Sequence, residues 1–256
     1  GPVYMNCSET NPDDMDYMMN AFLSEGDSSI VDYLDQYDID LRKEMVEFGT
    51  FEYNFTGRGL DIGIDGSASI PGLYAAGNAT GNVRGDITSA AVFGQICGES
   101  ASAYAKTVDE VSVEGNPVID EEITLINDLF SRPEGATWKE ANSMLQQIMR
   151  EYVGMKLRSE SLMKAGLKYI RDLRKYARAQ MKADNAHELM RALEVFDLID
   201  VGEAVALMSE NRKESRGRCH RRSDYTFTNP LLGNKFQTIK KEKDGTFKLE
   251  FREKIR

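Results

Sequence analysis

Residues 70–99 constrain the fold of this chain more than any other stretch, because they have the pattern of a buried strand, a glycine-rich turn and a helix. The strand is the small, apolar run Gly72–Gly77, whose composition is typical of a strand covered on both faces. The helix is predicted from Thr88 to Ala105. Its first turn presents backbone donors that suit a bound anion, those of Ile87, Thr88, Ser89 and Ala90.

The overall composition limits the classes of function that fit. The 256 residues include 41% hydrophobic residues, which is enough to build a core, and carry a formal net charge of −10. We therefore expect no affinity for nucleic acid. No apolar run approaches the roughly 18 residues of a membrane-spanning helix, so we expect no direct membrane insertion.

Cysteines and histidines are too few and too scattered for a metal site. Cys7, Cys97 and Cys219 show no paired spacing, and the only histidines are His187 and His220. We expect no bound metal, and a reducing compartment.

The first half of the chain changes pattern near residue 50. Residues 11–48 are acidic and mostly helical, with apolar residues on one side of a first helix, at Met15, Met18, Met19, Phe22 and Leu23. Residues 51–106 contain short apolar runs separated by glycines, and two of these, 51–55 and 60–64, are predicted to be strands or strand-like turns. Residues 107–118 form a polar linker.

The second half is predicted to be a helical bundle followed by a basic tail. Within residues 119–217, the capping boxes Thr137–Glu140 and Asn185–Glu188 start two helices, and apolar stripes at helical spacing indicate three to four helices in all. In residues 218–256, the turn Lys243–Gly245 precedes alternating apolar residues, which predicts a terminal β-hairpin.

Four motifs in this order resemble the carboxy-terminal part of the flavoprotein subunit of the succinate dehydrogenase and fumarate reductase family. They are Gly1–Met5, Asn54–Leu60, Pro71–Asn78 and Arg212–Gly217. The resemblance implies an α+β fragment: a C-terminal segment of an FAD-binding α/β domain, a helical bundle domain and a terminal β-hairpin. Residues 1–50 would end the capping domain, 51–106 would return to the FAD-binding domain, and 119–217 would form the helical C-terminal domain.

The resemblance also implies that FAD is the cofactor, completed by an N-terminal half that is absent from this chain. The run Gly57–Gly63 is not the dinucleotide fingerprint, because its glycine spacing is wrong and no helix follows it. Asn78, after Gly77, takes the place of a family Glu that hydrogen-bonds the cofactor, or it satisfies a tight turn. The amides of residues 87–90 would face the flavin.

The substrate residues depart from the family pattern. Asn54 stands where the family has its dicarboxylate-binding His, and the loop after Asn78 is shorter than in the family. Arg58 and Arg84 are candidates for a two-point clamp on an anionic substrate. The alternatives are that both arginines are solvated or bind cofactor phosphate.

The resemblance ends in a basic cluster. Its members are Glu214, Arg216, Arg218, His220, Arg221 and Arg222. It would dock an acidic electron-transfer partner or the remainder of the subunit, or form an intramolecular salt-bridge network that links the helical domain to the flavin domain.

The family resemblance implies an FAD-dependent oxidoreductase that transfers hydride between flavin and a small anionic substrate. Its partners would be the N-terminal FAD-binding half and an iron-sulfur electron-transfer subunit, and the chain alone would be inactive. The implied location is cytoplasmic, with a peripheral place on a membrane complex. One alternative is an adenylylsulfate reductase-like or other divergent flavoprotein, and another is a non-catalytic subunit-assembly module.

Overall fold

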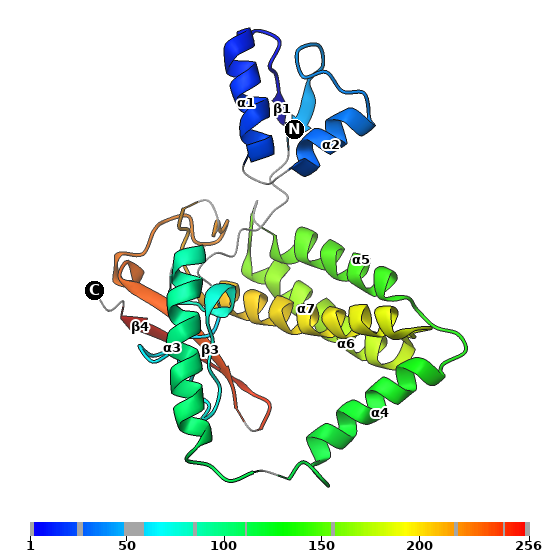
Figure 1. The fold of residues 1–256 in the computed structure, drawn as a ribbon, viewed down its shortest axis with the longest axis vertical. Coiled ribbons are helices and arrows are strands. Elements are labelled where there is room, and N and C mark those ends of the chain that lie inside the picture. Colours follow the sequence, from blue (N-terminus) through cyan, green and yellow to red (C-terminus); the bar gives the residue numbers. More distant parts are fainter. Residues whose placement is uncertain are drawn as a thin grey trace. The chain divides into compact units, whose positions relative to one another are not determined.

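The computed structural model describes residues 3–24, 28–48, 59–83, 86–110, 112–154, 157–217, 220–242 and 244–253. The chain divides into two compact units, Gly1–Lys106 and Thr107–Arg256. Each unit contains a hydrophobic cluster of its own, and Figure 1 shows the elements of both.

The first unit begins with a small sheet and two helices. Strand β1 (Val3–Met5) pairs antiparallel with β2 (Val46–Phe48), and helices α1 (Pro12–Ser24) and α2 (Ser28–Gln36) lie between them in the chain. The buried cluster consists of Cys7, Met15, Leu34 and Leu41. The predicted apolar side of α1 is only partly covered, since Met15 is 2% exposed but Leu23 is 55% exposed.

The glycine-rich part of this unit contains a short 3-10 helix, η1 (Gly77–Ala79), and the long helix α3 (Ile87–Ala105). The helix prediction is confirmed, but the strand predicted at 72–77 is wrong. Residues 60–64 form no strand either, which leaves the strand-like turn of their prediction. Only isolated bridges form there, Leu60 with Thr80 and Ser67 with Tyr74. A strand needs a neighbour along its length, and the described residues of this unit offer none. The strand predicted at 51–55 lies outside the described residues.

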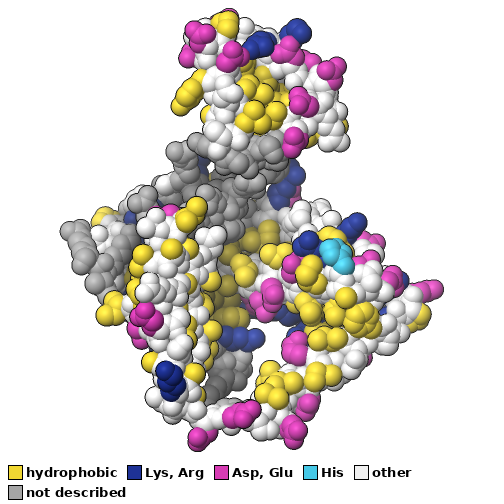
Figure 2. All heavy atoms as spheres, viewed as in Figure 1, with side chains coloured by type: hydrophobic (Ala, Val, Ile, Leu, Met, Phe, Trp, Pro, Cys, Tyr) yellow, Lys and Arg dark blue, Asp and Glu magenta, His cyan; other side chains and the backbone are white. Residues whose placement is uncertain are grey.

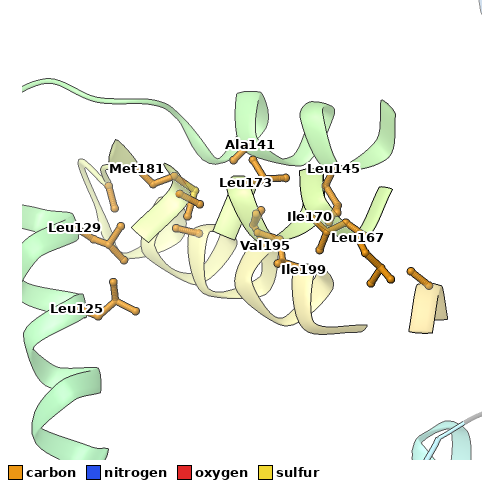
Figure 3. Close-up of a cluster of buried hydrophobic side chains, with 14 of the residues drawn as sticks. Leu125, Leu129, Ala141, Leu145, Leu167, Ile170, Leu173, Met181, Val195 and Ile199 are labelled. Carbon is orange, nitrogen blue, oxygen red and sulfur yellow. The ribbon is translucent and has the colours of Figure 1, made fainter. Parts of the chain in front are cut away.

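The second unit is built around helices, which confirms the predicted bundle. These are α4 (Pro117–Ser131), α5 (Trp138–Ile148), the π-helical turn η2 (Met149–Val153), α6 (Glu160–Gln180) and α7 (Ala186–Asn211). Figure 3 shows the apolar side chains that meet between them, and Leu129, Ile170 and Ile199 are 0% exposed. A Cβ added at Gly166 of α6 would lie 2.8 Å from the Cβ of Tyr152, so the absence of a side chain lets η2 approach α6 closely.

Local sequence signals set where two of these helices begin. The capping box at Thr137 and Glu140 forms as predicted, with both reciprocal hydrogen bonds present. At the start of α7, the Asn185 side chain accepts from the amide of Glu188 at 3.0 Å. The Glu188 carboxylate, however, accepts from the amide of Asp184 at 2.8 Å, so the second predicted box is only half formed.

The chain ends in the predicted hairpin. Strand β3 (Lys235–Lys241) pairs antiparallel with β4 (Phe247–Glu253), and the 3-10 helix η3 (Pro230–Leu232) precedes them. Gly245 in the turn has φ of +82°, a conformation that favours glycine. The alternate residues Phe247, Leu249 and Phe251 are half-buried on one face of β4.

The surface mixes charged and apolar side chains, as Figure 2 shows. Helix α4 carries several of the exposed apolar residues, namely Val118, Ile123 and Phe130. Among the helices of the described ranges, none is long and apolar enough to pass through a lipid bilayer.

Adjacent residues of α7 provide a matched test of the bundle core. Ile199→Ala removes a side chain that is 0% exposed, whereas Leu198→Ala trims one that is 48% exposed. We expect the first change to lower the free energy of unfolding by about 2–5 kcal/mol and the second by less than about 1 kcal/mol. Urea unfolding followed by circular dichroism measures both. Equal losses would show that Ile199 is not part of a packed core.

Candidate functional site

Two glycines bring backbone against backbone at the centre of the glycine-rich segment. The amide of Leu60 donates to the carbonyl of Ala79 at 2.8 Å, and the amide of Gly81 donates to the carbonyl of Leu60 at 2.8 Å. A Cβ at Gly59 would overlap the carbonyl oxygen of Ala79. A Cβ at Gly81 would lie 2.6 Å from the carbonyl oxygen of Gly59. Residues 59–60 and 79–81 are therefore clamped together in a way that only glycine permits.

Polar side chains complete this clamp. Thr80 is 2% exposed, and its hydroxyl donates to the carbonyl of Gly77 at 2.8 Å. Asn82 donates to the carbonyl of Ile62 at 2.7 Å and accepts from the amide of Ile62 at 3.3 Å. These bonds hold the turn at Gly77 and Asn78 in a fixed shape.

Helix α3 is fastened to the same segment by Cys97. Its thiol is buried and donates to the carbonyl of Ala75 at 3.1 Å. A Cβ at Gly66, whose φ is +78°, would overlap the Cys97 sulfur. Closer to the start of α3, Gly77 faces Ala90 in the first turn of the helix. The turn at Gly77 and the amino terminus of α3 are therefore held next to each other.

The amino terminus of α3 differs from its prediction in one respect. Asp86 is the N-cap, and its carboxylate accepts from the amide of Ser89 at 2.7 Å. The amide of Ala90 donates to the carbonyl of Asp86 at 3.0 Å, so it belongs to the helix ladder. The amides of Ile87 and Thr88, the other two predicted donors, bond neither the Asp86 side chain nor a carbonyl of the helix ladder. Asp86 also places a negative charge at the end where the helix dipole is positive.

Residues predicted to bind the cofactor lie close to one another. Gly77 and the first turn of α3 are adjacent, Asn78 lies exposed in η1, and the side chain of Ile87 is 90% exposed. The substrate candidates, Asn54, Arg58 and Arg84, fall outside the described residues. Among those that are described, no group of three or more His, Cys, Asp or Glu side chains is arranged to hold a metal ion.

The second polar centre surrounds Glu214, whose side chain is 0% exposed. Glu214 accepts from Arg212 at 2.7 Å, from Arg216 at 2.9 Å and from the amide of Asn229 at 2.9 Å. Burial raises the pKa of this carboxyl, but the hydrogen bonds from Arg216 and Asn229 and the charge of Arg212 outweigh it and hold the pKa below its usual value.

Arg222 is equally buried and caps the end of α7. Its guanidinium donates to the carbonyls of Ser209 at 3.1 Å and Glu210 at 2.7 Å. It also forms a two-bond pair with Asp224, at 2.8 and 2.6 Å. The hydrogen bond from Arg222 lowers the pKa of Asp224 to about 2, and Asp224 accepts from the amide of Glu160 at the start of α6.

Arg158 and His220 extend the network. The Arg158 guanidinium donates to the carbonyl of Val153 at 2.8 Å and to Nδ1 of His220 at 2.9 Å. Since Nδ1 accepts, Nε2 carries the proton and donates to the carbonyl of Arg212 at 2.8 Å. Burial lowers the pKa of His220, and the charges of Arg158 and Arg222 add to this, so the ring is neutral.

The described members of the basic cluster therefore pair within the second unit. Glu214 pairs with Arg216. His220 bonds the carbonyl of Arg212, and Arg222 bonds the end of α7. These contacts favour an intramolecular network, within the second unit, over a docking surface for an acidic partner. Arg221 is exposed, and Arg218 lies outside the described residues.

Asp86 and Arg158 are among the residues of these centres that sequence reasoning missed. Asp86 is an N-cap residue type directly before the helix, and that signal was present in the sequence. Arg158 had no local signal, because it meets His220 across 62 positions of the chain.

Comparisons with known proteins find a family model that matches part of the second unit. Residues 142–253 match the family described as fumarate reductase flavoprotein C-term. An uncharacterized FAD-dependent oxidoreductase of Methanocaldococcus jannaschii is 27% identical over 239 residues, which are 89% of this chain and 41% of that protein. The fumarate reductase flavoprotein subunit of Haemophilus influenzae is 25% identical over 186 residues, which are 68% of this chain and 31% of that protein.

Solved structures share the fold. A variant of E. coli quinol fumarate reductase has a TM-score of 0.73 at 20% identity and covers 99% of this chain and 44% of its own. Adenylylsulfate reductase from Archaeoglobus fulgidus has a TM-score of 0.72 at 17% identity and covers 100% of this chain and 48% of its own. The chain thus spans less than half the length of these relatives.

The neutral His220 predicts a pH dependence of stability. Because its folded pKa lies below the unfolded value of 6.5, its stabilising contribution is complete above that pH and is lost as the pH falls through it. We expect the free energy of unfolding to fall between about pH 7.5 and 5.5, by at most about 1.4 kcal/mol per pH unit for one proton. Urea titrations at several pH values measure this slope.

The chain supplies a control for that experiment in its other histidine, His187, which is exposed. His220→Gln flattens the slope, whereas His187→Gln leaves it unchanged. An unchanged slope in His220→Gln would show that another group causes the dependence.

Proposed function

We propose that this chain belongs to the fumarate reductase and succinate dehydrogenase flavoprotein family and covers its carboxy-terminal part. On that premise, residues 59–105 form one wall of an FAD site in an oxidoreductase. The observation that carries the proposal is the adjacency of the Gly77 turn and the amino terminus of α3. The turn is exposed at Asn78, and the helix start offers the amides of Ile87 and Thr88, which suits a planar ring with polar edges.

The residues present fit such a ring. The amides of Ile87 and Thr88 are donors left over at a helix start, where negative charge on a reduced flavin would be stabilised. The Gly77 backbone, at φ of +65°, leaves room beside Ala90 for close approach. Asn78 is exposed in the same turn and offers both a donor and an acceptor. FAD, when bound, supplies the hydride chemistry, and the chain positions it and adjusts its electrostatics.

The negative charge of Asp86 opposes the positive potential that the two amides provide. Its carboxylate occupies the same helix end and partly offsets the positive pole of α3. The chain would therefore hold the flavin at a more negative potential than a neutral N-cap would.

The substrate is proposed from the sequence alone. A small anionic substrate would be held by Arg58 and Arg84, with Asn54 at the place of the family histidine. An adenylylsulfate reductase-like reaction is the second candidate, and it is supported by the fold shared with the Archaeoglobus fulgidus enzyme over the whole of this chain.

The partners follow from the same premise. The N-terminal FAD-binding half would complete the site, and an iron-sulfur subunit would carry the electrons, in a cytoplasmic protein that sits peripherally on a membrane complex. Without the N-terminal half, the chain would be inactive. The remaining alternative is a non-catalytic module that serves only in subunit assembly.

The absorbance spectrum of the purified full-length gene product tests this function. We expect a flavin spectrum that is bleached by dithionite and restored by an electron acceptor, with fumarate and adenylylsulfate tried separately. Restoration by fumarate supports the first candidate and restoration by adenylylsulfate the second. A colourless full-length protein that still binds a partner subunit would contradict the FAD proposal and support the assembly module.

A further inference from the structure

A groove of about 710 Å³ lies between the helices and the hairpin of the second unit. One side is formed by α6 and α7, and the other by the turn and first residues of β4. In Figure 1 the hairpin runs past α7, with which β3 is in contact. None of its lining residues takes part in the proposed flavin site.

The floor of the groove is a buried carboxylate held by two arginines. The Glu203 side chain is 4% exposed and accepts from Arg171 at 2.7 Å and from Arg174 at 2.5 Å. Burial raises the pKa of Glu203, but the two guanidinium groups outweigh it and keep the pKa below its usual value. Arg174 also pairs with Asp200 at 2.6 Å, so both acidic residues of the lining are neutralised inside the groove.

The rim of the groove keeps positive charge. Arg171 uses only its Nε atom on Glu203, and its side chain is 52% exposed. Lys175 and Lys241 are exposed, and neither makes an ion pair with any of the described residues. The lining therefore has four cations, Arg171, Arg174, Lys175 and Lys241, and two carboxylates. This is a local excess of positive charge in a chain whose net charge is −10.

The hairpin side of the groove is apolar. Leu207 of α7 and Phe247 and Leu249 of β4 line it, and all three are half-buried. A free inorganic anion would use the cations but leave this wall exposed to water. An aliphatic side chain on the same ligand would cover it, at about 25 cal/mol for each Å² of apolar surface removed from water.

We propose that this groove is a docking site for an acidic, extended peptide segment of a partner protein, with carboxylates on Arg171, Lys175 and Lys241 and an aliphatic side chain against Phe247 and Leu249. A groove of about 710 Å³ suits a peptide segment rather than a folded domain. Charge complementarity gives the site its specificity for an acidic segment, and the apolar wall adds contact area.

The test uses the full chain and a fluorescein-labelled peptide of ten residues that contains six glutamates and two leucines. Fluorescence anisotropy should give a Kd on the order of 10 μM at low salt, weakening as the salt concentration rises. The double variant Lys175→Glu with Lys241→Glu should weaken binding by about tenfold or more. A peptide with serines in place of both leucines should bind several times more weakly.

A matched pair of lysines outside the groove provides the control. Lys139→Glu with Lys213→Glu changes the net charge equally, and both side chains are exposed and absent from the lining. We expect this variant to bind like the original chain, with unchanged circular dichroism in both variants. Equal weakening in the two variants, no loss in the groove variant, or complete displacement of the peptide by inorganic phosphate would each overturn the proposal.

Discussion

The buried guanidinium of Arg222 is the interaction on which the closure of the helical unit depends. It satisfies carbonyls at the end of α7, and through Asp224 it is linked to the amide of Glu160 at the start of α6. Helix ends leave carbonyls and amides without partners, and these groups are costly when buried. One side chain therefore joins the ends of the two longest helices to the tail that follows them.

Glu214 and His220 depend on the same closure. Glu214 holds Arg212 and Arg216 against the loop at Asn229, while neutral His220 bridges Arg158 and the carbonyl of Arg212. Each of these groups is stable in the interior only because its partners are in place, since an unpaired buried charge is strongly destabilising. The basic appearance of this stretch in the sequence reflects an internal network.

What could be predicted from sequence was local. The box at Thr137 and the hairpin at Gly245 depend on residues within a few positions of one another, and both formed as expected. The run Gly72–Gly77 has the composition of a buried strand, but a strand also requires a distant neighbour, which no local pattern supplies. The bond between Arg158 and His220 was unpredictable for the same reason. For the candidate site, the sequence singled out Gly77 and the first turn of α3, which lie next to each other, but it gave no role to the charge of Asp86.

At the start of α3 two amides and one carboxylate share a helix end, and their electrostatics would act on a flavin bound there. The most direct measurement is the flavin midpoint potential of the full-length protein with Asp86→Asn, which keeps an N-cap side chain but removes its charge. Glu99→Gln, a change of equal charge farther along α3, is the control. We predict a shift of about 30 mV to more positive values for Asp86→Asn, equivalent to about 1.4 kcal/mol for a two-electron couple, and none for the control. An unchanged potential in Asp86→Asn would contradict a flavin at this helix end.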